Sequence, residues 1–324
     1  MKYHQLGHSG LTVSAVGLGC NNFGRANSLT ETQAGTDAVV NACLEEGITF
    51  FDTADVYGKH AGLSEQLLGN ALVGKRDHVV LATKFGMDVG GLNGQDHGVR
   101  GSRAYIIKAV ESSLCRLGTD YIDLYQFHTP DTATPIDETL SALDDLITAG
   151  KVRYIGHSNR AGWQIADAEY VAQQLGAERF ISAQNHYNLL DRRAELEVLP
   201  AAEAYGLGVL PYFPLASGLL TGKYSTGTAP AGSRLSYNRT DMVHNADLEQ
   251  LAAFGDFARA RGVTEVDVAF GWLLAKGPIS SVIAGATSAA QVKANAATVN
   301  WQPNAEDLAA LDEIFPAPDP IALF

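Results

Sequence analysis

Three apolar, strand-like segments of this chain each end on a different ionisable side chain. The runs ITFFD, VVLATK and YIDLYQFH end at Asp52, Lys84 and His128, and Tyr57 follows shortly after the first run. In a barrel of parallel strands the carboxyl-terminal strand ends gather around one mouth, so groups remote in sequence converge there. Asp, Tyr, Lys and His together suit the delivery of a proton to a carbonyl oxygen.

Each member of this tetrad has a distinct expected role. Tyr57 is the candidate acid, but a phenol with an ordinary pKa of about 10 is a reluctant donor at neutral pH. The Lys84 ammonium would stabilise the phenolate and lower that pKa, and Asp52 would supply the countercharge that a buried lysine needs. His128 could orient the substrate oxygen. The alternative is a purely structural Asp52–Lys84 ion pair with the two rings packed beside it.

Other predicted strand ends add hydroxyl, amide and aromatic groups to the same mouth. These residues are Ser158, Asn159, Gln184, Asn185 and Tyr212. Amides and an aromatic face suit a flat heteroaromatic carboxamide such as nicotinamide. This polar lining favours a catalytic site over a structural ion pair.

The tetrad requires a barrel to position it, and the strand and helix patterns predict one. After an N-terminal hairpin (YHQL, a turn at residues 8–10, then LTVS), strand and helix patterns alternate to the end of the chain, which indicates a parallel sheet. We expect eight barrel strands, which end near Gly19, Asp52, Lys84, His128, Ser158, Asn185, Tyr212 and Gly285. The predicted fold is α/β, a (β/α)8 TIM barrel that forms one domain over residues 1–324.

Capping signals mark several of the intervening helices. Ser102 precedes the segment 103–117 and Gly118 follows it. Further helices are expected to begin at Thr134 with Pro135, at Asp191 and at Thr264. Two long connections, residues 85–101 and 213–245, follow barrel strands, so we expect them to overhang the mouth and shape substrate access. The alternative is that they are surface insertions without a role.

Composition and charge exclude several classes of function. The formal net charge of −13 leaves no general basic surface, which argues against nucleic acid as a partner. No apolar segment reaches the roughly 20 residues that span a bilayer, and the start lacks a signal-peptide core, so we expect a cytoplasmic protein. The three cysteines, Cys20, Cys43 and Cys115, suit neither a disulfide framework nor a zinc motif. We expect Cys43 and Cys115 in the core, and no metal site.

Two glycine-rich strings resemble nucleotide-binding loops but lack their defining residues. VGLGCNNFG has Asn22 where a dinucleotide-binding turn has its third glycine. GLLTGKY lacks the spacing of a phosphate loop and the Ser or Thr after Lys223. A classical dinucleotide fold and a nucleoside triphosphatase are therefore disfavoured.

The chain resembles the aldo-keto reductase superfamily, in the branch that includes potassium-channel beta subunits and many bacterial reductases. The resemblance extends from the first hairpin to about Asn300 and is carried by FFDTADVYG, LATKFG, SLCRLGTDYIDLYQFHTPD, GKVRYIGHSN, PLASGLLTGKY and VIAGATSAAQVKAN. It implies a barrel that binds NADPH without a Rossmann turn and reversibly reduces an aldehyde or ketone. The alternative is an NADPH-binding accessory or sensor protein like the channel subunits, although the intact tetrad and the absence of an extended N-terminal segment weigh against it. An isomerase or lyase on the same barrel would lack an evident metal or phosphate site.

The resemblance also implies residue roles. Tyr57 is similar to the family's general acid, Lys84 and Asp52 to its tuning pair, and His128 to its orienting residue. The carboxamide and stacking positions correspond to Ser158, Asn159, Gln184 and Tyr212. The pyrophosphate loop corresponds to Leu215, Gly218 and Lys223, with Arg234 farther along it. The adenosine end corresponds to Gly285, Thr287, Gln291 and Asn295.

The chain departs from the family pattern in three places. Ala294 stands where a Glu often precedes the last Asn, which loosens the expected adenine contacts. Residues 285–291 contain no Lys or Arg, so a preference for NADPH over NADH would rest on Lys223 and Arg234. Phe213 follows the stacking aromatic where serine is common, which alters the packing expected beside the nicotinamide.

Overall fold

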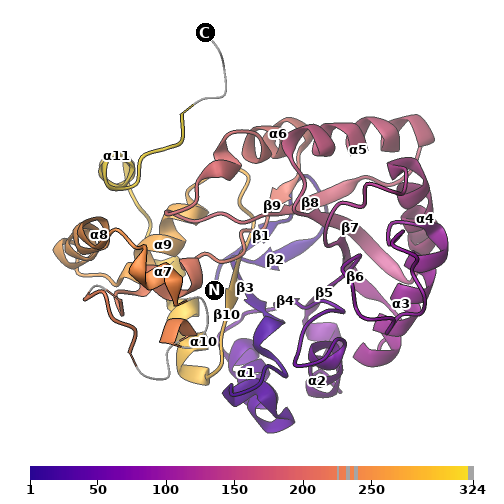
Figure 1. Cartoon of the computed structure of the whole chain (residues 1–324), viewed down its shortest axis with the longest axis horizontal. Helices are drawn as coiled ribbons and strands as arrows, with labels where there is room; N and C mark the ends of the chain where they lie inside the picture. Colours follow the sequence, from indigo (N-terminus) through magenta and orange to yellow (C-terminus); the bar gives the residue numbers. More distant parts are fainter. Residues whose placement is uncertain (225, 231–233, 237–239, 320–324) are drawn as a thin grey trace.

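The computed structural model describes residues 1–224, 226–230, 234–236 and 240–319, with only the backbone at Arg234. Eight parallel strands form one sheet in the order β10-β3-β4-β5-β6-β7-β8-β9. Figure 1 shows this sheet curling into a ring with helices around its outside. The strands are β3 (Val16–Gly19), β4 (Phe50–Asp52), β5 (Val80–Phe85), β6 (Ile122–Phe127), β7 (Val152–Ser158), β8 (Phe180–Gln184), β9 (Gly208–Val209) and β10 (Val282–Gly285).

Backbone hydrogen bonds that join β9, β10 and the residues next to them close the ring. Val209 N donates to Pro278 O over 2.7 Å, and Ser280 N donates to Val209 O over 3.1 Å. Farther along, Ile283 N donates to Pro211 O over 3.1 Å. The predicted (β/α)8 barrel is therefore confirmed.

An antiparallel hairpin covers the amino-terminal end of the barrel. Strands β1 (Tyr3–Gln5) and β2 (Thr12–Ser14) pair with Tyr3 opposite Ser14, as the sequence predicted. Apolar side chains of the hairpin join an inner core contributed by the strands, made of Leu6, Leu11, Val13, Phe50, Ala82, Leu124, Leu210 and Ile283. A larger core lies between the sheet and the helices. With the amino-terminal end filled, the polar strand ends collect at the opposite end.

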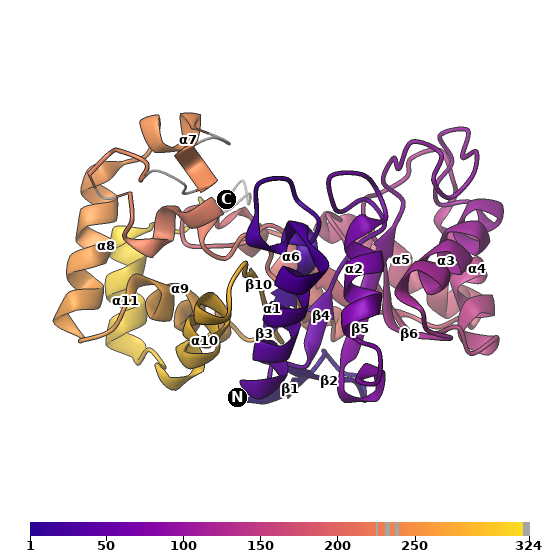
Figure 2. The ribbon, with the colours of Figure 1, turned by 90° about the horizontal axis from the view of Figure 1, so that it is seen from below.

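The helices follow the strands in the alternating order that the sequence predicted. They are α1 (Gln33–Glu45), α2 (Leu63–Ala71), α3 (Arg103–Leu117), α4 (Ile136–Thr148), α5 (Gly162–Leu175), α6 (Val198–Tyr205), α7 (Asp241–His244), α8 (Leu248–Ala260), α9 (Glu265–Leu274), α10 (Ala289–Ala297) and α11 (Ala305–Ile314). Short 3-10 turns are η1 (Cys20–Asn22), η2 (Leu29–Glu31), η3 (Arg76–His78), η4 (Arg193–Glu195), η5 (Ala216–Thr221), η6 (Arg234–Ser236) and η7 (Thr298–Asn300). Figure 2 shows α8, α9 and α11 together at one side of the barrel. Within the described ranges no helix is long and apolar enough to cross a membrane.

Two of the predicted helix starts are confirmed. Ser102 Oγ accepts a hydrogen bond from Tyr105 N at the start of α3, and Gly118 ends that helix with φ 62°. Thr264 and Asp267 form a reciprocal capping box at the start of α9. These helix starts were predictable from the sequence because each capping side chain bonds to a backbone N–H within the first helical turn.

Two other helix starts and one cysteine are corrected. Thr134 does not cap α4, which begins after Pro135, because its hydroxyl donates to Asp131 over 2.7 Å. No helix begins at Asp191, since its carboxylate pairs with the guanidinium of Arg193 over 2.6 Å, and α6 starts only at Val198. Cys43 is buried as predicted, but Cys115 is exposed because it lies on the outer side of α3.

The seventh barrel strand also ends earlier than predicted. Regular β9 stops at Val209, whereas the sequence placed its end near Tyr212. The chain nevertheless continues along β8, where Leu210 N donates to Ala183 O and Tyr212 N to Asn185 O. Pro211 interrupts the regular ladder because proline has no N–H to donate. Tyr212 therefore still arrives at the mouth.

Candidate active site at the barrel mouth

A buried ion pair joins the ends of β4 and β5. Lys84 Nζ lies 2.5 Å from Asp52 Oδ2 and also donates to the carbonyl oxygen of Thr53 over 2.9 Å. Both charged side chains are almost fully buried. A buried ammonium needs this carboxylate and carbonyl to replace its lost hydration.

Tyr57 and His128 complete the predicted cluster. Lys84 Nζ lies 5.2 Å from the centre of the Tyr57 ring. The Tyr57 and His128 rings meet edge to face, with centroids 5.8 Å apart and an interplanar angle of 86°. The structure thus brings together the four residues that the strand-end pattern predicted as neighbours.

Two glutamines hold the second oxygen of the Asp52 carboxylate. Gln126 Nε2 donates to Asp52 Oδ1 over 2.8 Å, and Gln184 Nε2 donates to the same atom over 3.1 Å. Sequence reasoning did not single out Gln126. Its signal was present, because Gln126 lies two residues before His128 and side chains two apart along a strand share a face. The two amides and Lys84 together fix the carboxylate from both of its oxygens.

The environment sets the proton positions in the cluster. Burial lowers the pKa of Lys84, but Asp52 and Tyr57 outweigh that effect, so its pKa is raised and the ammonium persists. Burial raises the pKa of Tyr57 by more than Lys84 lowers it, opposite to the net lowering expected from the sequence. Burial and the Lys84 charge push the pKa of His128 well below its ordinary value. At neutral pH the site therefore holds an ammonium, a phenol and a neutral imidazole.

One ring nitrogen of the neutral imidazole is enclosed without a hydrogen-bond partner in the described part of the chain. His128 Nδ1 is buried and has no hydrogen-bond partner among the described residues. A neutral imidazole carries one N–H donor and one acceptor nitrogen. Because Nδ1 is enclosed, Nε2 is the ring nitrogen left to hydrogen-bond an oxygen brought in beside Tyr57.

The predicted nicotinamide-binding residues are linked to one another and to the tetrad. Asn159, with a left-handed φ of 59°, donates from Nδ2 to His128 O over 2.9 Å. Its Oδ1 accepts from the Tyr212 hydroxyl over 2.8 Å. Ser158 Oγ donates to Gln184 O over 2.7 Å. Asparagine tolerates this backbone conformation better than most residues, and the turn aims its side chain into the mouth network.

His186 supports the predicted stacking residue. Its ring lies parallel to that of Tyr212, with centroids 5.4 Å apart and an interplanar angle of 10°. Asp191 Oδ2 lies 3.1 Å from His186 Nδ1. Sequence reasoning did not single out His186, because stacking between neighbouring strand ends leaves no local sequence signal.

The loop after β9 contains a tight turn with a hydroxyl group that is unpartnered within the described ranges. Ala216, Ser217 and Gly218 all have positive φ values of 46°, 60° and 112°. Two of their N–H groups are used within the loop, since Ala216 N donates to Phe213 O over 2.9 Å and Gly218 N donates to Leu215 O over 2.7 Å. Ser217 Oγ is buried and lacks a hydrogen-bond partner in the part of the chain that the structure describes. An orphaned hydroxyl beside this turn fits a cofactor phosphate, and Ser217 was missed because serine is common in loops.

The remaining predicted cofactor residues lie on the same loop and on α10. Leu215 O accepts from Gly218 N over 2.7 Å, which closes the turn, and Lys223 is exposed. The Arg234 side chain lies outside what the structure describes. At the start of α10, Gln291 Oε1 accepts from Thr287 N over 2.7 Å. Gly285 ends β10 and Asn295 is buried within α10.

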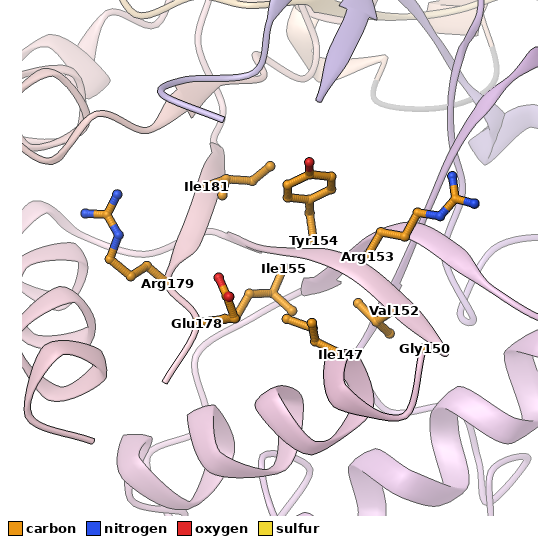
Figure 3. A pocket seen from close by; sticks show the side chains of 9 residues that line it. All are labelled: Ile147, Gly150, Val152, Arg153, Tyr154, Ile155, Glu178, Arg179 and Ile181. Carbon is orange, nitrogen blue, oxygen red and sulfur yellow. The ribbon is translucent and has the colours of Figure 1, made fainter. Parts of the chain in front are cut away.

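Two cavities lie away from this cluster. One of about 440 Å³, shown in Figure 3, is lined by residues at the amino-terminal ends of β7 and β8, including Tyr154, Glu178 and Ile181. Another of about 550 Å³ lies beside the N-terminal hairpin. In TIM barrels the amino-terminal face serves stability, whereas reactions occur at the carboxyl-terminal mouth. Neither cavity contains a tetrad residue, and no group of His, Cys, Asp and Glu within the described ranges could hold a metal ion.

Comparison with known proteins gives consistent matches over the whole barrel. The model of the Aldo/keto reductase family matches residues 15–315. The uncharacterized oxidoreductase YrpG of Bacillus subtilis (strain 168) is 39% identical over 98% of this chain and 97% of that protein. A probable voltage-gated potassium channel subunit beta of Oryza sativa subsp. japonica is 36% identical over 91% of this chain and 90% of that protein. The L-glyceraldehyde 3-phosphate reductase of Escherichia coli (strain K12) is 32% identical over 93% of this chain and 88% of that protein.

Proposed function

Because this chain belongs to the aldo/keto reductase family, we propose that it uses NADPH to reduce an aldehyde or ketone to an alcohol, with Tyr57 as the proton donor. The observation that carries this proposal is the cluster of Tyr57 with a buried ammonium and a neutral imidazole. A bare structural ion pair would not need a neutral imidazole beside the phenol of Tyr57. The reverse oxidation of the alcohol uses the same groups.

Each residue of the tetrad has a separate role in proton transfer. His128 donates a hydrogen bond to the carbonyl oxygen and holds it beside the Tyr57 hydroxyl. Tyr57 then protonates this oxygen, and Lys84 stabilises the phenolate that remains. Asp52 keeps Lys84 charged and in place, and is itself held by the two glutamines. When bound, NADPH supplies the hydride, which is the harder part of the chemistry.

The proposed cofactor contacts run from the barrel mouth toward α10. Ser158, Asn159 and Gln184 would hold the carboxamide, and Tyr212 would stack on the nicotinamide. The phosphates would lie against Leu215, Ser217 and Gly218, with Lys223 and Arg234 at the 2′-phosphate. The adenosine end would contact Gly285, Thr287, Gln291 and Asn295.

An accessory role is the second candidate, since one similar protein is a probable channel subunit beta. Such a protein would bind NADPH without sustained turnover. A screen separates the two functions: NADPH oxidation is followed with aldehydes, ketones, keto-steroids, sugars and L-glyceraldehyde 3-phosphate. Turnover of any of these, lost in Tyr57→Phe by at least about 100-fold while NADPH affinity stays within about twofold, supports the reductase. NADPH binding without turnover of any compound would support the accessory role instead.

A further inference from the structure

Asp55 is a buried carboxyl group that the proposed mechanism does not use. It lies two residues before Tyr57, has no exposed surface, and accepts a hydrogen bond at Oδ2 from Asn93 Nδ2 over 2.9 Å. Its other oxygen, Oδ1, has no partner in the described ranges. An ordinary loop carboxylate is solvated, whereas this one is fully buried.

Asn93 belongs to the long β5–α3 loop (residues 86–102) and connects Asp55 to a wider polar network. Asn93 Oδ1 accepts from Arg116 Nη1 over 3.2 Å, and Arg116 Nε donates to Glu65 Oε2 over 2.6 Å. Glu65 Oε1 in turn accepts from the hydroxyl of Thr83 over 2.6 Å. The network therefore runs from the long loop through α3 and α2 to β5, where it ends beside Lys84.

The backbone around Tyr57 is held in the same place. Asp55 N donates to Lys84 O over 3.2 Å, and Asp55 O accepts from Gly62 N over 2.7 Å. Gly62 has a φ of 83°, and a Cβ there would lie 2.8 Å from Arg116 and 2.9 Å from Leu92. The segment that carries Tyr57 is thus packed against Leu92 of the β5–α3 loop and Arg116 of α3.

The charges in this network do not balance if Asp55 is ionised. One guanidinium, Arg116, faces the carboxyl groups of both Glu65 and Asp55, while Lys84 is engaged by Asp52. Burial and the Glu65 charge raise the pKa of Asp55 to about 8, against the lowering by Arg116, Asn93 and Lys84. The titratable or charged groups that face Asp55 are Glu65 on α2, Lys84 on β5, Tyr105 and Arg116 on α3, and Tyr125 on β6.

We infer that Asp55 is a positioning residue that couples the β5–α3 loop to Tyr57, and that ionisation of Asp55 sets the alkaline limit of turnover. The protonated carboxyl keeps the contact with Asn93 in a network that is close to neutral. Once ionised, the carboxylate is buried near the charge of Glu65. Asn93 binds this ionised form more strongly, but burial and the repulsion from Glu65 outweigh that bond, so the segment moves to admit water or to bring Arg116 closer. The segment that carries Tyr57 then loses its support from the loop. This inference rests on the proposed function, because it concerns the acid of that reaction.

The activity test compares kcat from about pH 6.5 to about pH 9.5 in three proteins. The unmodified protein should lose activity above about pH 8, by about tenfold per pH unit where one ionisation controls the rate. Asp55→Asn has a neutral side chain at every pH. The ratio of its kcat at about pH 9 to its kcat at about pH 7 should therefore be at least about fivefold higher than the same ratio in the unmodified protein. The control is Asp88→Asn, which removes an exposed carboxylate from the same loop and should keep the unmodified profile. An unchanged alkaline decline in Asp55→Asn overturns the inference.

A second measurement does not depend on turnover. The reporters are the amides of Gly62 and Ser64, which donate to Asp55 O and to Tyr57 O. Their hydrogen exchange, corrected for the intrinsic effect of pH, should accelerate above about pH 8 in the unmodified protein and not in Asp55→Asn. Asn93→Ala, which keeps Asp55 but removes its partner, should accelerate exchange at these amides at every pH and raise KM more than it lowers kcat. If no carbonyl compound is reduced, the proposed function fails, and the exchange experiment still decides the coupling. Equal exchange in all three proteins removes the coupling even where reductase activity is found.

Discussion

Lys84 and Asp52 lie 2.5 Å apart with both charges buried, and the ammonium also faces the ring of Tyr57 from 5.2 Å. The pair therefore has two effects. Asp52 neutralises a lysine charge that could not otherwise be buried, and the pair places that charge beside Tyr57, the proposed acid. Because removal of one partner leaves the other unpaired, structure and activity should both respond to a change at either position.

Lys84→Met should lower kcat by at least about 100-fold, because the phenolate of Tyr57 loses its nearby ammonium. It should also destabilise the fold by about 3–5 kcal/mol, since the Asp52 carboxylate stays buried without its partner. The double variant Asp52→Leu, Lys84→Met removes both charges and should recover part of the stability but none of the activity. Urea unfolding and steady-state rates measure the two effects. A double variant that is no more stable than Lys84→Met would contradict this account of the pair.

Much of this arrangement was predictable because parallel strands place their ends together. The alternating patterns identified the barrel, and Asp52, Lys84 and His128 each ended a predicted strand. Tyr57 followed from its position just past one of those ends. Position along a strand therefore carried most of the information about the tetrad.

The parts that sequence reasoning missed depend on contacts between remote segments. Gln126 and Ser217 are common residue types whose importance arises only from their partners, or from the lack of one, in the fold. Asp55 was not among the predicted site residues, because nothing in the local sequence shows that Asn93 will contact it. The net rise in the Tyr57 pKa was also unpredictable, since it depends on how fully the phenol is desolvated.

Tyr212 should contribute to cofactor binding in two separable ways. Tyr212→Phe keeps an aromatic face but removes the hydrogen bond to Asn159, and a neutral hydrogen bond is worth about 0.5–1.5 kcal/mol. We expect NADPH affinity to fall about two- to tenfold in Tyr212→Phe and further in Tyr212→Ala, which also loses stacking. Fluorescence titration with NADPH gives these affinities. Equal affinities in the Phe and Ala variants would argue against stacking on this ring.

Lys223 should distinguish NADPH from NADH. A lysine that pairs with a 2′-phosphate contributes about 1.5–3 kcal/mol through a charge-assisted bond, and the cofactor without that phosphate gains nothing from it. Lys223→Gln should therefore weaken NADPH binding at least about tenfold and leave NADH binding within about twofold. Lys151→Gln is a matched control, because Lys151 lies directly before β7, at the amino-terminal end of the barrel and away from the proposed cofactor site. There it pairs with Glu111 of α3. Parallel losses for both cofactors would place Lys223 elsewhere on the bound molecule.

His157 should make the protein sensitive to acid independently of catalysis. Its side chain is fully buried against Phe180, and neither ring nitrogen has a hydrogen-bond partner in the part of the chain described. Burial and the nearby charge of Arg160 lower the pKa of His157 well below its ordinary value. The unfolded chain therefore binds a proton near pH 6.5 that the folded chain does not bind. The free energy of unfolding accordingly falls as the pH drops below that value.

His157→Leu removes this proton uptake while keeping a similar volume. Between about pH 6.5 and pH 5, one histidine of this kind lowers the free energy of unfolding by up to about 1.4 kcal/mol per pH unit. The free energy of unfolding of His157→Leu should therefore decline less steeply than that of the unmodified protein, by up to this amount. Urea unfolding at several pH values measures the slope directly. The exposed His60 provides the control, since His60→Leu should leave the slope of the unmodified protein unchanged. If His157→Leu shows the same slope as the unmodified protein, His157 must gain a proton in the folded state, and its burial as a neutral ring would be disproved.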